Sequence, residues 1–284
     1  LLADKKKPYN YKYNKYTIFR PKGYLDSFYN ITNDIKLFAG LEIKWTEVRS
    51  WEGREFDTDG EKNIESDMTL IDVDPKLQKF DQDGWINSIK FGIAFDTRDY
   101  EPDPKKGVFV DWTGQIAHKA LGSELNFRRM SVGARTYLSP IKQLTFVGRM
   151  GYTTVAGDCP FHELGYFNFL LNVKEGLGNN RTLRGYKSQR FIGNTMTLSN
   201  AEVRFELVEV KPLGQRFVFK PLAFVDTGRV YNHGGDPFIK WEDYQVGYGG
   251  GLVLTWNQAT VIHFYWGFSD EDSSFSMDVQ HAID

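Results

Sequence analysis

The chain has 284 residues, 15% of them aromatic, with 27 glycines and 10 prolines, so residues that favour strands and residues that favour turns are both plentiful. Lys and Arg number 35 and Asp and Glu number 37, and the net charge of −2 lacks the basic excess of a nucleic-acid-binding protein, which excludes that partner class. With a mean hydropathy of −0.45, no apolar run approaches the ~18 residues of a membrane-spanning helix, so helical membrane proteins are excluded too.

Aromatic side chains are frequent in the first 33 residues, and their placement predicts a hairpin. Segments 9–20 and 24–32 have the composition of strands, and Pro21 and Gly23 between them are typical of a turn. The first clear strand follows at 34–51. Residues 1–33 are therefore expected to form an N-terminal hairpin or strand.

From residue 84 onward, apolar and polar residues alternate with a period of two, which is the pattern of strands with two unlike faces. In residues 89–95, for example, two Ile and two Phe share one face, and Lys90 lies on the other. The pattern predicts nine strands, at about 84–99, 107–120, 125–139, 143–156, 195–210, 216–231, 244–256, 260–269 and 273–283. No repeat of 20 to 50 residues is evident, which disfavours propellers and solenoids.

The two faces favour a membrane barrel over a soluble β-sandwich, which is the alternative that sedimentation without detergent would decide. One face is apolar on almost every strand, and the other carries charges such as Arg135, Arg149 and Lys220. The strands exceed the usual five or six residues and suit a tilted span of a membrane, which takes about 9 to 11. Tryptophans near the strand ends match the aromatic girdles of outer-membrane barrels, namely Trp45, Trp51, Trp85, Trp112, Trp241, Trp256 and Trp266.

These features predict one all-β domain over residues 1–284, an antiparallel transmembrane β-barrel of twelve strands. Short turns alternate with longer connections at 52–83, 157–194 and 232–243, an asymmetry typical of outer-membrane barrels. A closed barrel leaves no backbone group unpaired in lipid. The expected location is therefore the bacterial outer membrane, crossed many times.

Four groups of residues, taken together and in chain order, resemble one known family. The first is a turn between two strands, with Asp96, Arg98, Asp99 and Gly107. The second is a segment of the longest loop, formed by Leu183, Arg184, Gly185 and Tyr186. The third belongs to a later strand and consists of Phe224, Asp226 and Gly228. The fourth is a glycine cluster of Gly247, Gly249, Gly250 and Gly251.

In these groups the chain resembles the barrel of the BamA/TamA-type outer-membrane assembly family, also called the bacterial surface antigen family, over residues 84–284. The resemblance implies that 157–194 is an extracellular loop folded into the lumen, and that the strand with Asp226 is the wall that receives its arginine. It implies that the glycine cluster belongs to a weakly paired seam between the last and first strands. It also implies sixteen strands, although the chain length leaves room for about twelve.

Electrostatics gives a physical reason for the loop segment. The guanidinium of Arg184 can bind a carboxylate through two parallel hydrogen bonds, and Asp226 is the expected partner. Gly185 permits a tight backbone turn, and Tyr186 is expected to stack on the wall near Phe224. Two other wall arginines are alternative partners of Asp226, namely Arg149 and Arg204.

The resemblance implies a role in the insertion, assembly or translocation of proteins at the bacterial outer membrane. Its partners would be outer-membrane lipid and unfolded outer-membrane client proteins, with the seam offering backbone groups to a client strand. The alternative is a passive pore, a lipid-handling barrel or the membrane anchor of a secreted effector. A homodimer through the apolar exterior stays open, and the family's periplasmic polypeptide-binding domains have no counterpart in the sequence.

Nothing in the sequence indicates catalysis, a metal or another cofactor. The five histidines are scattered, without a metal-binding or nucleophile motif. His162 and Glu163 are interpreted as solvated loop residues, and the segment 57–61 as a solvated acidic loop. The single cysteine, Cys159, cannot form an internal disulfide. A protein that is not an enzyme is therefore expected.

Overall fold

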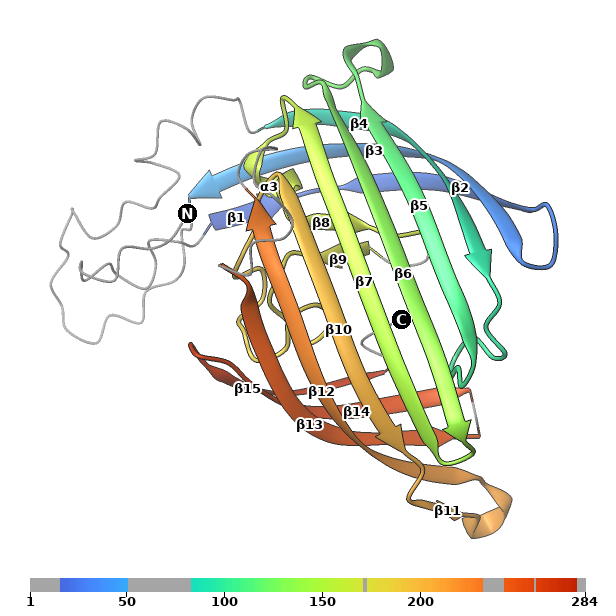
Figure 1. Ribbon diagram of the computed structural model, residues 1–284. Helices are drawn as coiled ribbons and strands as arrows, with labels where there is room; N and C mark the ends of the chain where they lie inside the picture. Colours follow the sequence, from blue (N-terminus) through green and yellow to red (C-terminus); the bar gives the residue numbers. More distant parts are fainter. Residues whose placement is uncertain (1–15, 51–82, 171–172, 232–242, 258, 280–284) are drawn as a thin grey trace, which may run out of the picture.

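The described residues form a curved antiparallel sheet, the wall of a barrel (Figure 1). The computed structural model describes residues 16–50, 83–170, 173–231, 243–257 and 259–279. One sheet contains 13 strands, in the order β1-β3-β4-β5-β6-β7-β10-β12-β13-β14-β15, with β2 also paired to β3 and β11 to β12. The predicted all-β barrel fold is confirmed.

The main strands lie where the alternation predicts them. Their bounds are β1 Tyr16–Phe19, β2 Lys22–Asn30, β3 Ile35–Ser50, β4 Gly84–Asp96, β5 Gly107–Ala117, β6 Phe127–Ile141, β7 Leu144–Gly157, β10 Thr195–Phe205, β11 Val208–Val210, β12 Phe217–Tyr231, β13 Gln245–Trp256, β14 Thr260–Phe268 and β15 Ser273–Val279. Two 3-10 turns connect strands, η2 at Lys119–Leu121 and η3 at Pro212–Gly214. Each long strand is hydrogen-bonded to its sequence neighbour in the sheet, as in an up-and-down barrel.

The two faces of the sheet have the polarity of a membrane barrel. On β7, Phe146 and Met150 face outward and are 47% and 66% exposed, whereas Arg149 between them is 2% exposed. The same inversion holds on β5, where Trp112 faces outward and Asp111 is buried. Side chains alternate because successive residues of a strand point to opposite faces. Charges therefore lie inside the curve of the sheet and apolar side chains outside it.

The predicted N-terminal hairpin is wrong for the residues that the structure describes. Both β1 and β2 pair antiparallel with β3, at its Glu47–Ser50 end and its Lys36–Lys44 stretch respectively. They form one line along the same side of β3, interrupted at Arg20 and Pro21. Proline has no backbone N–H to donate, so it interrupts a ladder without reversing the chain. Residues 9–15 of the predicted hairpin lie outside the described part.

The sheet has 13 strands instead of the predicted 12, because one further row of strand is divided into two pieces. As β2 continues β1, so β11 continues β10, since both pair with β12. The ladder slips by one residue between the two pieces, near Glu206 and Leu207. The sheet thus has eleven rows of strand, and its two outermost rows are β1–β2 and β15.

The connection between β7 and β10 fills the inside of the curve. It contains the short helix α3 (Phe161–Leu164) and a small two-stranded sheet of β8 (Tyr166–Asn168) and β9 (Val173–Glu175), all drawn behind the front strands in Figure 1. Its apolar residues form a buried cluster with Met196 and Leu198 of β10. Among the described residues, no helix has the length and apolar character needed to cross a membrane.

Candidate functional site

The tip of the β7–β10 loop is bound to the wall through Arg184. Its Nε donates to Oδ2 of Asp226 at 2.7 Å, and one terminal nitrogen donates to Oδ1 at 2.8 Å. The backbone N–H of Arg184 donates to the same carboxylate at 3.0 Å. Asp226 is fully buried on β12 and Arg184 is 3% exposed. The structure therefore brings together the loop arginine and the wall aspartate that the sequence singled out.

A second carboxylate completes this site, and the sequence analysis assigned it no role. The other terminal nitrogen of Arg184 donates to Glu202 on β10 at 2.8 Å. Arg204, two residues along β10, donates to the other oxygen of Glu202 at 2.6 Å. Burial lowers the pKa of Arg184, but Asp226 and Glu202 outweigh it and hold the pKa above its usual value. The guanidinium thus stays charged although it is buried.

The two alternative partners of Asp226 are engaged elsewhere. Arg204 binds Glu202, as described, and Arg149 donates to the side-chain oxygen of Asn200 at 2.9 Å. Asn200 in turn donates to Asp226 at 2.7 Å and to the carbonyl of Thr182 at 2.8 Å. Asn200 therefore joins the wall arginine, the wall aspartate and the loop in one hydrogen-bonded network.

Glycines let the loop tip lie flat against the wall. Gly185 has φ of +96°, which favours glycine, and a Cβ there would collide with the backbone of Phe268 on β14. A Cβ on Gly247 of β13 would collide with the carbonyl oxygen of Arg184. The hydroxyl of Ser269 donates to the carbonyl of Gly185 at 2.9 Å. Glycine is therefore required on both sides of the contact, because the backbones of the loop and the wall approach each other closely.

The predicted place of Tyr186 is wrong. The guanidinium of Arg184 covers Phe224 instead, with its carbon 3.5 Å from the ring centroid. Tyr186 packs edge-on against Phe191 of its own loop, and its hydroxyl donates to Asp270 at 2.6 Å. The backbone turn at Gly185 sends the two neighbouring side chains in different directions, so Tyr186 joins the loop's own apolar cluster.

A second buried anchor surrounds Glu163 on α3. One of its carboxylate oxygens is 2.9 Å from Nζ of Lys44 on β3, and the other is 3.3 Å from Arg20, between β1 and β2. Arg129 on β6 is 3.7 Å away and also donates to the backbone carbonyl of Glu163. Arg20 further contacts the ring of His162 at 2.6 Å. Three wall cations thus converge on one loop carboxylate.

The interpretation of His162 and Glu163 as solvated loop residues is therefore wrong. Both are buried, at 6% and 1% exposure. Burial raises the pKa of Glu163, but Lys44, the neighbouring ring of His162, Arg129 and Arg20 together hold the pKa well below its usual value. The sequence shows no signal for this anchor, because Arg20 and Lys44 lie more than 100 positions from Glu163.

The loop also reaches the outermost strand β15. Arg181 donates to both oxygens of Asp278 on β15, at 2.6 and 2.8 Å. Asn180 donates to the same carboxylate at 3.1 Å. Since Arg20 adjoins the other outermost row, one loop is fastened near both edges of the sheet.

The turn between β4 and β5 is ordered by its own side chains. Arg98 donates to both carboxylate oxygens of Asp96, each at 2.9 Å. One oxygen of Asp99 accepts three backbone N–H groups, from Tyr100, Lys105 and Lys106. Gly107 has φ of +111°, and a Cβ there would collide with the carbonyl of Thr97. All four predicted turn residues thus shape one compact turn.

Comparison with known proteins decides the family, since residues 4–273 match the family model described as the Omp85 superfamily domain. The chain belongs to the Omp85 superfamily. It is similar in structure to BamA from Haemophilus ducreyi lacking POTRA domains 1–3, with a TM-score of 0.60, 14% identity, and coverage of 93% of this chain and 54% of that one. It is also similar to CdiB from Escherichia coli, with a TM-score of 0.59, 14% identity, and coverage of 93% and 44%. None of the curated proteins compared with it matches.

Membership in the Omp85 superfamily confirms the resemblance seen in the sequence. The chain is an outer-membrane β-barrel of the superfamily whose members assemble or translocate proteins. It spans about half the length of the two solved structures.

The structure of this Omp85 barrel corrects the assignment of the glycine cluster to a seam. Gly247 and Gly249–Gly251 belong to β13, which is hydrogen-bonded to β12 on one side and β14 on the other. The strand lies two rows inside the edge formed by β15. A Cβ on Gly249 or Gly251 would collide with carbonyl oxygens of β14. The glycines therefore allow β14 to lie close to β13, and Gly247 allows the backbone of Arg184 to approach the wall.

Within the described ranges of this Omp85 barrel, no group of three or more His, Cys, Asp or Glu side chains could hold a metal ion. The acidic segment 57–61 lies outside those ranges, as do Trp51 and Trp241 of the predicted girdles. Of the remaining girdle residues, Trp85, Trp112, Trp256 and Trp266 are exposed on the outer surface.

Proposed function

We propose that this barrel takes part in the insertion, assembly or translocation of polypeptides at the outer membrane, by pairing client strands with the edges of its sheet. Superfamily membership supports the general role. The exposed edge strand β2 is the observation that supports the mechanism. No chemical step is required, because strand addition is a matter of hydrogen bonding and packing.

All nine residues of β2 are exposed, although the strand is rich in apolar side chains. Leu25 and Tyr29 on one face are 71% and 69% exposed, and Tyr24 on the other face is 67% exposed. Among the residues that the structure describes, β2 pairs with β3 alone, so along this part of the chain the backbone groups of its other side are available to a new strand. In lipid such groups are costly unless paired, which favours addition of a strand with apolar outward residues.

The opposite edge has similar chemistry. On β15, Phe275, Met277 and Val279 alternate outward and are 63%, 59% and 52% exposed. The loop is fastened near both edges, through Arg20 beside β2 and Asp278 on β15. These contacts would hold the edges in place while a client strand pairs with one of them.

Site-specific cross-linking during client insertion tests the proposal. The protein is reconstituted in phospholipid vesicles, and a urea-unfolded outer-membrane barrel protein is added as client. Cys159→Ser is the background, although burial raises the pKa of the Cys159 thiol to about 12 and makes it a poor nucleophile. Cysteines at Leu25 on β2 and Met277 on β15 should cross-link to the client, and vesicles with the barrel should fold the client faster than empty vesicles.

Met150→Cys is the matched control, because this residue is 66% exposed on the outer face but belongs to β7, which is paired on both sides. Cross-links at Met150 as strong as those at Leu25 and Met277 would contradict edge pairing. Folding no faster than in empty vesicles would contradict the assembly role. Single-channel conductance in that case would identify a passive pore, and its absence would favour a membrane anchor.

A further inference from the structure

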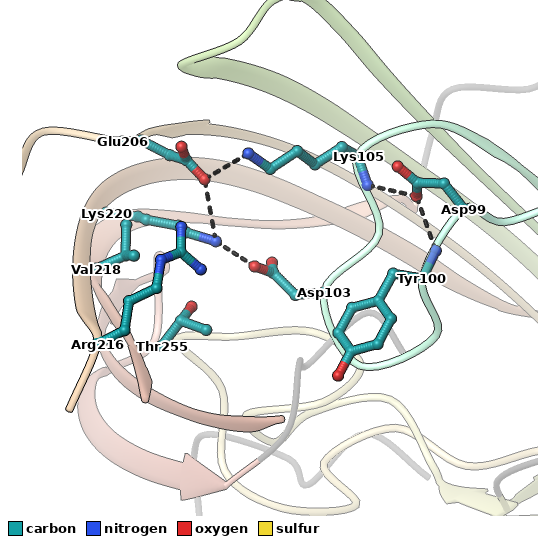
Figure 2. Close-up of a pocket in the computed structure, with 9 residues that line it drawn as sticks. All are labelled: Asp99, Tyr100, Asp103, Lys105, Glu206, Arg216, Val218, Lys220 and Thr255. Carbon is teal, nitrogen blue, oxygen red and sulfur yellow. Dashed lines mark hydrogen bonds and ion pairs between the residues drawn. The ribbon is translucent and has the colours of Figure 1, made fainter. Parts of the chain in front are cut away.

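The turn between β4 and β5 does more than connect two strands. Its residues 99–106, which we call the strap, contact strands on a distant part of the wall (Figure 2). Nζ of Lys220 on β12 forms an ion pair with Asp103 of the strap. Lys105 of the strap is 2.8 Å from Glu206, at the end of β10. Figure 2 shows both strap side chains directed at the opposite residues.

The strap must cross the inside of the barrel to make these contacts. Between β5 and β12 lie β6, β7 and β10, so the wall between them spans four strand spacings, or about 19 Å. Lys220 is 3% exposed and belongs to the inward-facing row of β12, with Val218 and Leu222. The hydroxyl of Ser139 on β6 donates to the carbonyl of Lys105 at 2.9 Å, which fastens the strap midway. The strap therefore runs along the inner side of the wall.

Its position is at one mouth of the lumen. The turns β6–β7 and β10–β12 lie at the same end as the strap, because each strand runs antiparallel to its neighbours. The β7–β10 loop enters the lumen from the opposite end. A cavity of about 240 Å³ separates the strap from the wall and is lined by Asp103, Lys105, Glu206 and Lys220, among others. The ion pairs and the hydrogen bond from Ser139 thus hold the strap against the wall.

The strap is stiff enough to move as one unit. Asp99 binds the backbone N–H groups of Tyr100, Lys105 and Lys106 at 3.0 to 3.2 Å, so both ends of the strap are tied to one carboxylate. Pro102 and Pro104 further restrict its backbone. A stiff segment held in this way would leave the wall as a unit if its ion pairs were broken.

We propose that the strap is a charge-latched gate of the short-turn mouth, closed by the ion pairs of Lys220 with Asp103 and of Lys105 with Glu206. Lys220 also lies 3.5 Å from Glu206, so one lysine joins both pairs. Opposite charges hold the strap in place, and like charges in the same positions repel it. The proposal concerns passage through the lumen and does not depend on client strands pairing with the sheet edges.

Single-channel recording of the full chain in planar bilayers tests the gate. Lys220→Asp faces Asp103 and Glu206 with a like charge, and we expect the open probability to rise at least about tenfold over the native protein. The exchange Asp103→Lys with Lys220→Asp restores opposite charges between positions 103 and 220 but leaves a like charge beside Glu206, and we expect it to return the open probability part of the way towards the native value. Asp103→Asn removes one charge from a turn outside the strands, so it should fold and give an intermediate rise.

Lys211→Asp is the matched control. This lysine lies between β11 and β12 at the same mouth and pairs with Glu209 at 3.2 Å, away from the strap. It makes the same change in net charge and should leave the open probability unchanged. Heat-modified migration on gels checks that each variant is folded. Equal effects of Lys220→Asp and Lys211→Asp, no effect of Asp103→Asn, or failure of the exchange to lower the open probability in a folded protein would each overturn the gate.

Discussion

Both buried anchors of the β7–β10 loop are ion pairs, but the charges of the loop and the wall are reversed between them. At the tip, a loop cation meets wall carboxylates, since Arg184 binds Asp226 and Glu202. At α3, a loop carboxylate meets wall cations, since Glu163 lies among Lys44, Arg20 and Arg129. The loop thus presents a cation to wall carboxylates at one point and a carboxylate to wall cations at the other. The comparison teaches that the loop is positioned by charge at two points, so its orientation in the lumen is defined.

The anchors differ in geometry as well. The Arg184 anchor combines parallel hydrogen bonds with a guanidinium lying on the ring of Phe224. The Glu163 anchor gathers three cations from three wall segments, and Lys44 donates one hydrogen bond to its carboxylate. Bidentate and stacked contacts fix orientation more strictly than a cluster of point charges. Four experiments test this contrast.

Arg184→Ala should have the largest effect, because it leaves Asp226 and Glu202 buried without their shared cation. Breaking a buried ion pair on one side costs about 3–5 kcal/mol. The free energy of unfolding is measured by urea titration of the folded barrel in lipid, together with protease cleavage of the loop. Arg181→Ala is the control. The side chain of Arg181 is 41% exposed, so its ion pair with Asp278 should contribute about 1 kcal/mol or less. Equal losses in the two variants would remove the distinction between the tip anchor and a surface pair.

Glu163→Gln should have the second largest effect, at about 2–3 kcal/mol, because it keeps the side-chain size but removes the charge that three cations share. Cleavage should appear near α3, while the tip stays protected by Arg184. Limited proteolysis followed by mass spectrometry of the fragments separates the two anchors. Cleavage at the tip as well would show that the anchors are a single cooperative unit.

Acid should weaken the Glu163 anchor. The pKa of Glu163 in the folded protein lies below the value of about 4.3 of an unfolded chain, so its contribution to stability is fully present above that value. The contribution is lost as the pH falls towards the folded-state pKa. The difference in unfolding free energy between the native protein and Glu163→Gln should therefore be constant from pH 6 to 8 and shrink below about pH 4. A difference that grows on acidification would contradict the ion-pair assignment.

Arg190→Ala should have the smallest effect. Its pair with Glu271 at 2.6 Å joins the loop to the β14–β15 turn, but both side chains are close to 30% exposed. Exposed pairs contribute about 0–1 kcal/mol, and salt screens them. Unfolding titrations at low and high salt measure this. A loss comparable to that of Arg184→Ala would mean that the outer contacts, not the buried anchors, hold the loop.

The strands and the polarity of their two faces follow from the amino-acid sequence alone. Alternation with a period of two locates the ten main strands from β3 to β15, because side chains of a strand point to opposite faces whatever the rest of the fold does. The resemblance of its motifs to a known family also singled out Arg184 and Asp226, since a guanidinium can bind a carboxylate through two parallel hydrogen bonds.

The tertiary structure decided which distant residues meet. From the sequence, Glu163 is predicted to be solvated, Tyr186 to lie against Phe224 and the glycines of β13 to belong to the seam, and the structure differs on each. It likewise paired Asp103 with Lys220, 117 positions away. Such contacts depend on the curvature of the sheet and on the path of the loop through the lumen. Alternation along one strand carries information about the neighbouring residue, and none about the far wall.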